Sequence, residues 1–268
     1  MTVHRSNTGF RRRWLSGARG PGFASPDTAP LLARMTTPPS AQRAALYDQI
    51  MAMTASVRPK LNGFYLQAAH DKQAGQLNLL SASYTLLEVG SFAWIVDRGY
   101  TSDGATGYLD TQFNPTLPGS LVTQNAFSMG VFAGTDAIST APICGNSPMR
   151  ILPHTAANQA QARISSNTQT NHALPADTAR GLSAIGRGDA VNATAYKDGV
   201  NLGAQAAAST ALNAFNFLFL AATPSAGGAP TSYSPLRCVG GFFGGQLSDA
   251  EHATMANAFA TWTAATGA

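Results

Sequence analysis

Hydrophobic and polar positions alternate over short distances through most of this chain, a pattern typical of antiparallel β-strands. From residue 61 onward, short apolar runs are separated by Gly, Pro, Asn and Asp. Phe127, Met129 and Val131 share one face of such a run, and Asp198-Gly199 between two runs is a strong signal for a hairpin. The predicted strands cover residues 63–68, 92–97, 106–112, 125–133, 149–153, 159–165, 181–187, 191–197, 200–204, 214–222 and 235–244.

Two segments follow the helical period instead. The first covers residues 40–57 and begins at Ser40, a good N-cap residue. The second covers residues 248–265 and begins with a capping box between Ser248 and Glu251. Their apolar faces consist of Leu46, Ile50, Met53 and Val57 in the first helix and of Met255, Phe259 and Trp262 in the second. We expect both helices to pack on the strands or on each other.

The first 39 residues have a composition of their own, rich in Gly and Pro and without a period. They predict an extended basic arm, followed by a helix and linker at 40–60 and a strand-rich domain at 61–268. Residues 1–60 hold nine of the Arg and Lys residues and two acids, whereas residues 61–268 are net acidic. The arm combines basic with large apolar side chains, namely Phe10, Arg11, Arg12, Arg13 and Trp14. It is therefore predicted to anchor the protein to an acidic surface of another subunit, with nucleic-acid binding as the alternative.

Composition narrows the class of protein. Charged residues make up 11% of the chain, against about 25% in typical soluble proteins, and Glu occurs only at positions 88 and 251. This argues against a helix-rich cytosolic enzyme and against a coiled coil. No apolar run approaches the roughly 18 residues of a spanning helix, and no apolar export region follows Arg11–Leu15, so we expect no membrane insertion. Cys144 and Cys238 are interpreted as two buried thiols, with one long-range disulfide as the alternative.

Several segments resemble a known family. They are Asp97–Pro115, Ala195–Gly199, Phe215–Ala222 and Phe242–Ser248, with Ala33–Pro39 and Leu61–Leu79 upstream. Together they resemble the concanavalin A-like (laminin-G-like) jelly-roll proteins encoded by tailed bacteriophages and prophages, over residues 30–265. The resemblance implies a mainly β, two-sheet antiparallel jelly-roll sandwich in a structural or surface protein of a virion. Relatives of this fold bind glycans, cleave glycans or only decorate a particle, and the fold does not choose among these.

Candidate catalytic and metal-binding residues are sparse. Glucanases of this fold place Glu-x-Asp-x-Glu on one strand, whereas Glu88 and Glu251 fall on separate predicted elements. Asp97, Asp103 and Asp110 remain an alternative acid set and, with Asn114, an alternative Ca²⁺ set. Turn formation explains them better. The histidines at 4, 70, 154, 172 and 252 are isolated and are predicted to lie on the surface or in loops.

A non-catalytic sugar site needs an aromatic platform and a few polar side chains on loops. Candidates of this type are Tyr233, Tyr196, Asn167, Asn171 and Asn201. None is singled out, and we predict no catalytic residue, metal or cofactor.

The sequence therefore predicts a non-enzymatic structural protein of a tailed-phage virion, a tail or baseplate fibre or a capsid decoration. Its arm binds other virion proteins, and its lectin-like domain faces host surface glycan. We expect a homo-oligomer in the extracellular particle, assembled in the bacterial cytoplasm. The alternatives are a glycan-degrading depolymerase of the same fold and a free bacterial lectin or adhesin.

Overall fold

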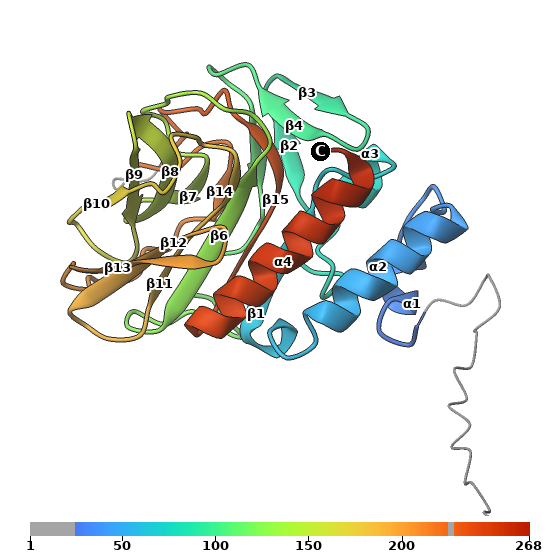
Figure 1. The fold of residues 1–268 in the computed structure, drawn as a ribbon, viewed down its shortest axis with the longest axis horizontal. Coiled ribbons are helices and arrows are strands. Elements are labelled where there is room, and N and C mark those ends of the chain that lie inside the picture. The colour runs from blue at the N-terminus through green and yellow to red at the C-terminus, as the bar shows by residue number, and fades with distance from the viewer. Residues whose placement is uncertain (1–24, 225–227) are drawn as a thin grey trace, which may run out of the picture.

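The computed structural model describes residues 25–224 and 228–268, which form two antiparallel sheets with helices on one side (Figure 1). The first sheet has the order β13-β12-β11-β6-β15-β4-β3, and β1 also pairs with β15. Its strands are β1 (Leu61–Leu66), β3 (Phe92–Ile95), β4 (Gly99–Ser102), β6 (Phe127–Ala133), β11 (Gly181–Arg187), β12 (Asn192–Lys197), β13 (Val200–Ala206) and β15 (Arg237–Gly244).

The second sheet has the order β10-β9-β8-β7-β14-β5-β2. Its strands are β2 (Leu87–Val89), β5 (Tyr108–Asp110), β7 (Cys144–Asn146), β8 (Met149–Ala156), β9 (Gln159–Arg163), β10 (Thr170–Ala173) and β14 (Leu218–Phe219). The helices are α1 (Ala29–Leu32), α2 (Ala41–Met53), α3 (Lys72–Gln76) and α4 (Asp249–Thr266), with a 3-10 turn at Arg58–Lys60. This is the two-sheet sandwich that the sequence predicts.

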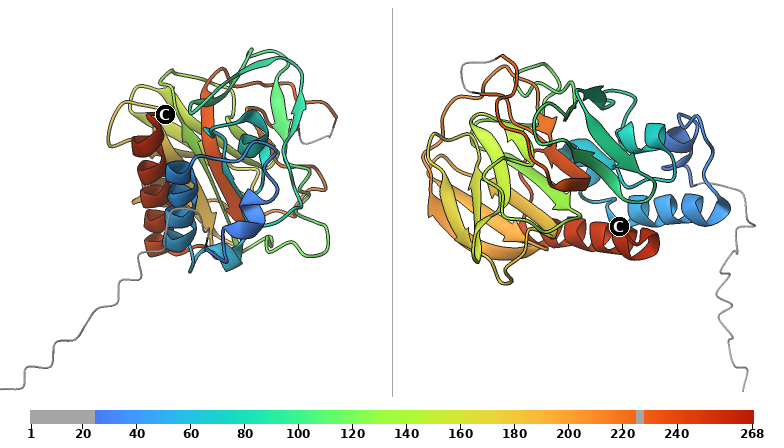
Figure 2. Two further views of the ribbon diagram at one scale, coloured as in Figure 1. Left: turned by 90° about the vertical axis from the view of Figure 1, so that its right-hand side faces the viewer. Right: turned by 90° about the horizontal axis from the view of Figure 1, so that it is seen from above.

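The molecule has three layers, which are the helices α2 and α4, the first sheet and the second sheet. Their order determines which outer sheet face has helices packed on it. Apolar side chains from the two sheets meet in an inner core, which includes Met129, Ile151 and Phe243. A second apolar cluster joins α2 and α4 to the opposite face of the first sheet, through Phe242 and Phe259 among others. Figure 2 shows α2 and α4 side by side on this side of the molecule. The outer face of the second sheet has no helix of the described residues over it.

Local sequence signals explain where α4 begins and how it is held. Ser248 accepts a hydrogen bond from the Glu251 amide at 3.3 Å, and Glu251 accepts one from the Ser248 amide at 2.8 Å, so the predicted capping box is confirmed. Trp262 is fully buried, lies 4.9 Å from the ring of Tyr47 on α2 and donates to the Ala68 carbonyl at 2.9 Å. The two predicted helices therefore pack on each other and on the first sheet.

Two details of the helical prediction are corrected. In α2 the buried side chains are Tyr47, Ile50 and Met51, whereas Leu46 and Met53 are only half-buried. The buried face is thus rotated from the predicted stripe, because Tyr47 packs against α4.

The segment before α2 also differs from the prediction of an extended arm up to residue 39. Residues 29–32 form α1, and Leu31 and Met35 are buried in the helical cluster. Arg34 donates to the Asn78 carbonyl at 2.7 Å, which ties the segment to the loop after α3. The body of the protein therefore begins at least as early as residue 25. The anchoring residues Phe10, Arg11, Arg12, Arg13 and Trp14 lie outside the described residues.

Most predicted strands are present, and the Asp198-Gly199 hairpin is confirmed with positive φ at both residues. The predicted central strand at 214–222 is reduced to Leu218–Phe219, because Leu220 adopts a φ of 67° and leaves the extended conformation. Its central place, between β5 and β7, is correct. The short strands β2, β4, β7 and β10 were not predicted, since their lengths of three or four residues carry little periodicity.

Cys144 and Cys238 are both free and fully buried, in opposite sheets, so the interpretation as two buried thiols is confirmed. Burial raises the pKa of both thiols. Among the helices in residues 25–224 and 228–268, none is long and apolar enough to span a membrane.

Candidate functional site

A hollow of about 280 Å³ lies on the uncovered face of the second sheet. Its lining combines an aromatic ring, a carboxylate, an amide and a hydroxyl with apolar surface. These residues are Tyr108, Asp110, Ala214, Phe215, Asn216, Leu218, Thr223, Gly228 and Pro230. Tyr108 and Asp110 alternate with Leu109, which is fully buried in the inner core. The pleat of β5 therefore directs both polar side chains outward.

The polar centre of this hollow is a contact between Asp110 and Asn216. The Asn216 amide nitrogen lies 3.0 Å and 3.1 Å from the two carboxylate oxygens of Asp110. The Gln112 backbone amide donates to Oδ1 at 2.7 Å, so Asp110 also forms the turn that the sequence predicts. Among the described residues, the carbonyl oxygen of the Asn216 side chain accepts no hydrogen bond. The pair therefore presents carboxylate and amide oxygens next to each other.

Two tyrosine rings stand beside this pair. The rings of Tyr108 and Tyr233 lie 6.3 Å apart at an interplanar angle of 41°, and the Tyr233 hydroxyl donates to the Pro230 carbonyl. Burial, with the nearby Asp110 and Tyr233, raises the pKa of Tyr108. Tyr108 is therefore neutral at physiological pH. The two rings together provide a partly exposed aromatic surface.

The other predicted acids are not brought to this site. Asp97 forms an ion pair with Arg43 of α2 at 2.6 Å. Asp103 accepts from the hydroxyl and amide of Thr106 and from the amides of Ala105 and Gly107, and these bonds lower its pKa. The turn interpretation is correct for Asp103.

Asn114 is likewise a turn residue, since its side chain accepts from the Thr116 amide at 3.0 Å. In the described part of the chain, no three His, Cys, Asp or Glu side chains form a group that could hold a metal ion. The four candidate Ca²⁺ ligands are thus not gathered. Glu88 and Glu251 lie on β2 and α4, where they pair with Lys72 and Lys60 respectively.

Of the residues predicted as candidates for a sugar site, some lie near the hollow and others do not. Tyr233 stands next to the hollow, as just described. Tyr196 does not qualify, because it is a buried residue of β12 that donates to Asp249 at 2.8 Å and stacks on His252 at 3.8 Å. Asn201 lies on β13 and also binds Asp249, on the helical side of the molecule.

Asn167 lies in a loop, whereas Asn171 is an outward-facing residue of β10. The decisive residues Tyr108 and Asn216 were not among the candidates. Tyr108 was visible only as part of the predicted strand 106–112 and of the family-like segment Asp97–Pro115, and Asn216 only as an interruption of an apolar run.

The histidines correct another expectation. His154, His172 and His252 are buried rather than surface or loop residues, and burial lowers the pKa of His172 and of His252 to about 4. His70 lies in a loop and contacts the Thr37 carbonyl at 2.9 Å. His4 lies outside the described residues.

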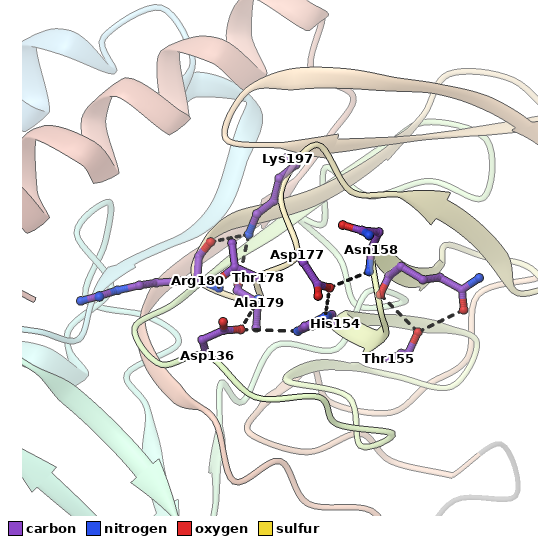
Figure 3. A network of polar contacts seen from close by, with 10 residues as sticks. Asp136, His154, Thr155, Asn158, Asp177, Thr178, Ala179, Arg180 and Lys197 are labelled. Atoms are coloured by element: carbon purple, nitrogen blue, oxygen red, sulfur yellow. Dashed lines mark hydrogen bonds and ion pairs between the residues drawn. The ribbon is translucent and has the colours of Figure 1, made fainter.

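His154 of β8 is the centre of a polar network that joins this strand to the β6–β7 loop and to the β10–β11 loop (Figure 3). Its two ring nitrogens face Asp136 at 3.4 Å and Asp177 at 2.8 Å. The buried ammonium group of Lys197 donates to the carbonyls of Ala179 and Arg180 at 3.0 Å and 2.6 Å. Within the described residues, no hydroxyl or thiol forms a hydrogen bond with His154, so the arrangement lacks an activated nucleophile. It is a structural tie between the β6–β7 and β10–β11 loops.

A second hollow, of about 500 Å³, lies between α4 and the first sheet. Its wall is formed mainly by alanines of α4 and by Phe132, with Arg180, Asp198 and Asn257 at the rim. Asp198 already accepts from the Leu182 amide at 2.7 Å. Among the described residues of this lining, Phe132 is the one aromatic residue, and no hydrogen bond joins Asn257 to Asp198.

Comparison with solved structures identifies the fold. The chain superposes on a mutant of Trypanosoma rangeli sialidase displaying trans-sialidase activity with a TM-score of 0.52 and 12% identity, covering 83% of this chain and 39% of that one. It superposes on botulinum neurotoxin type C, whose cell entry depends on interaction with two ganglioside molecules, with a TM-score of 0.51 and 11% identity, covering 76% and 52%. The chain thus spans about half or less of these proteins.

The sequence matches no protein-family model and no curated protein. At this level of identity the similarity concerns the fold, which is a concanavalin A-like β-sandwich of two antiparallel sheets.

Proposed function

We propose that this protein is a non-enzymatic glycan-binding domain whose site is the hollow around Tyr108, Asp110 and Asn216. Sugar rings present apolar C–H faces and hydroxyl groups that both donate and accept hydrogen bonds. A site for them needs an aromatic surface beside a few fixed polar groups. The observation that carries the proposal is the contact of Asp110 with Asn216 beside the Tyr108 and Tyr233 rings, on the outer face of the second sheet.

Binding without hydrolysis is favoured because the acidic residues outside the hollow already form ion pairs or hydrogen bonds within the protein. Glycoside hydrolysis requires two carboxyl groups that flank one glycosidic bond. Asp110 is the one carboxylate that lines the hollow, and Asp97, Asp103, Glu88 and Glu251 each hold another structural partner. The depolymerase alternative would therefore need a second acid that the described part of the site does not supply.

The similar structures support the proposal only through their fold. One is a sialidase and one a neurotoxin that interacts with gangliosides, so the concanavalin A-like sandwich occurs in proteins that meet glycans. The residues of the hollow, rather than this similarity, give the proposal its specific content.

Binding to a glycan array is the test. The full chain and its Tyr108→Ala variant would be applied to an array of neutral and acidic glycans, and hits would be measured by calorimetry. We expect at least one glycan class to bind, and the variant to lose about fivefold in affinity, because aromatic contacts contribute on the order of 1 kcal/mol. Asp27→Asn, an exposed carboxylate paired with Arg58 far from the hollow, is the matched control. An array without any bound glycan would refute the proposal, and release of reducing sugar would favour the enzyme.

We further propose that the domain is displayed on a tailed-phage particle as a fibre, baseplate or decoration protein. The resemblance of its turn and strand motifs to virion jelly-roll proteins supports this, as does the basic and apolar composition of residues 10–14, suited to a neighbouring subunit. Mass spectrometry of purified particles from the encoding host tests the proposal. Detection of the chain, and its loss from particles when residues 1–24 are deleted, is expected; particles without the chain would contradict it.

A further inference from the structure

A pair of arginines lies on the same open sheet face as the hollow. Arg150 on β8 and Arg163 on β9 are directly opposite residues in the antiparallel pairing of these strands. Their chain neighbours Ile151 and Ala162 belong to the inner core, so the pleat directs both guanidinium groups outward. The two side chains are half-buried rather than fully exposed.

This pair carries uncompensated positive charge. Among the described residues, no carboxylate lies within ion-pair distance of either guanidinium, although Arg43 and Arg58 both have such a partner. Arg150 donates to the Gln169 side chain at 2.5 Å, whereas Arg163 has no side-chain hydrogen bond there. The Nε atoms of both residues are buried without a partner. Burial lowers the pKa of both, and Arg163 contributes to the effect on Arg150.

Folding alone gives no reason for this arrangement. Like charges placed directly opposite on adjacent strands destabilise a sheet, and unpaired buried donors add to the cost. Residues that lower the stability of the folded protein and have no structural role are typical of binding sites. A bound anion would remove both costs at once, because a guanidinium donates in a planar fork that matches a carboxylate or sulfate.

The register connects this pair to the hollow. One row of directly paired residues runs across the sheet from Asp110 through Leu218 and Gly145 to Arg150 and Arg163. With neighbouring strands about 4.8 Å apart, Asp110 and Arg150 are separated by about 14 Å. Gly145, whose φ is 130° and whose Cβ would lie 1.9 Å from the Met149 carbonyl oxygen, adds no side chain to the row. Leu218, which is 2% exposed, is the one large apolar side chain in the row and lies between the hollow and the arginine pair.

From these observations we infer that Arg150 and Arg163 bind the acidic group of an anionic glycan, a carboxylate or a sulfate ester, whose neutral part occupies the hollow. This inference rests on the proposed glycan-binding function and names its substrate class. The groups around the pair are the amides Gln161 and Gln169, which suit hydroxyl groups. Two arginines flanked by amides are too few for a nucleic-acid backbone, which is bound by many cations. The net acidic character of residues 61–268 also disfavours a polyanion of that kind.

Titration calorimetry with matched ligands tests the inference. The probes are an oligogalacturonate, its neutral methyl ester of the same length, a sulfated oligosaccharide and a single-stranded oligonucleotide of equal charge. Wild type is compared with Arg163→Gln, Arg150→Gln and Arg163→Lys, and Arg180→Gln removes an exposed charge away from this face as the control. Unfolding curves verify that each variant is folded. A variant that does not fold is replaced by Gln169→Ala, which removes the hydrogen bond between Arg150 and Gln169.

The expected result is that at least one acidic oligosaccharide binds about tenfold or more tightly than the neutral ester. Arg163→Gln and Arg150→Gln abolish that preference, Arg163→Lys restores it in part, and Arg180→Gln leaves it unchanged. Carboxylate and sulfate are distinguished by which acidic probe binds. Equal affinity for acid and ester would overturn this inference while leaving the proposed function intact. Binding of the oligonucleotide alone, or of neither acidic oligosaccharide, would overturn this inference, whereas the proposed function is decided by the glycan array.

Discussion

The amide of Asn216 lies 3.0 Å from the carboxylate of Asp110, although 106 residues separate them in the sequence. Each residue is ordinary by itself, Asp110 as a turn former and Asn216 as a polar break in an apolar run. Together, beside Tyr108, they form the polar centre of a hollow on the open sheet face. The contact makes the site depend on the correct pairing of β5 with β14.

Asp110→Asn is expected to weaken binding of the glycan that the array identifies by about tenfold, because a charged acceptor is replaced by a neutral amide. Asn216→Ala should have a similar effect, and the double variant should lose less than the sum, since the two residues act as a pair. A double-mutant cycle measured by calorimetry checks this. Strict additivity would show that Asp110 and Asn216 do not bind the sugar as a unit.

The arginine pair gives a prediction about stability without any ligand. Arg163→Gln removes one of two like charges on adjacent strands, so the free energy of unfolding is expected to rise by about 0.2–1 kcal/mol. Arg163→Lys keeps the charge and should leave the free energy of unfolding nearly unchanged. Urea unfolding at low salt measures both, and the gain should shrink at high salt. A loss of stability in Arg163→Gln would mean that the guanidinium has a structural role.

Buried His252 predicts a pH dependence of stability. Burial lowers its pKa to about 4, while Asp249 and Glu251 partly oppose this effect, and the unfolded chain titrates near 6.5. Between these values the unfolded state binds more protons, so stability is complete above about pH 6.5 and falls as the pH decreases toward 4. His172 adds in the same direction.

His252→Leu removes one of these two contributions. The drop in Tm from about pH 7.5 to about pH 5 should therefore be smaller in the variant than in the wild type. Thermal unfolding followed by circular dichroism measures both drops. Equal drops would mean that the pKa of His252 is the same in the folded and the unfolded protein, which would contradict the effect of burial.

Trp262 holds the helical layer on the first sheet. It is fully buried between Tyr47 and the strands, and the Arg43 guanidinium lies 5.0 Å above its ring. Trp262→Ala is expected to lower the free energy of unfolding by about 3–5 kcal/mol. Trp262→Phe keeps most of the apolar volume and loses the hydrogen bond to Ala68, so a smaller loss is expected. Glycan binding by folded Trp262→Phe should be unchanged, because the hollow lies on the opposite sheet; a large loss would show coupling between the layers.

The sequence by itself determined the elements whose signals are local. The capping box of Ser248 and Glu251 and the Asp198-Gly199 hairpin need only neighbouring residues. The alternation of Phe127, Met129 and Val131 likewise marks a strand with one buried face. The turn role of Asp103 follows from its own short loop. Such features are recognisable because their energetics are settled within a few residues.

Only the tertiary structure determined the features that depend on strand register and on the order of the layers. Strands as short as β7 and β14 are stabilised by their neighbours rather than by their own pattern, and Leu220 ends its strand through a backbone angle that no periodicity reveals. Which sheet face the helices cover also follows from packing. The helices pack on the first sheet, and the register of the second sheet aligns Asp110 with Arg150. Residues distant in the sequence therefore share one sheet face.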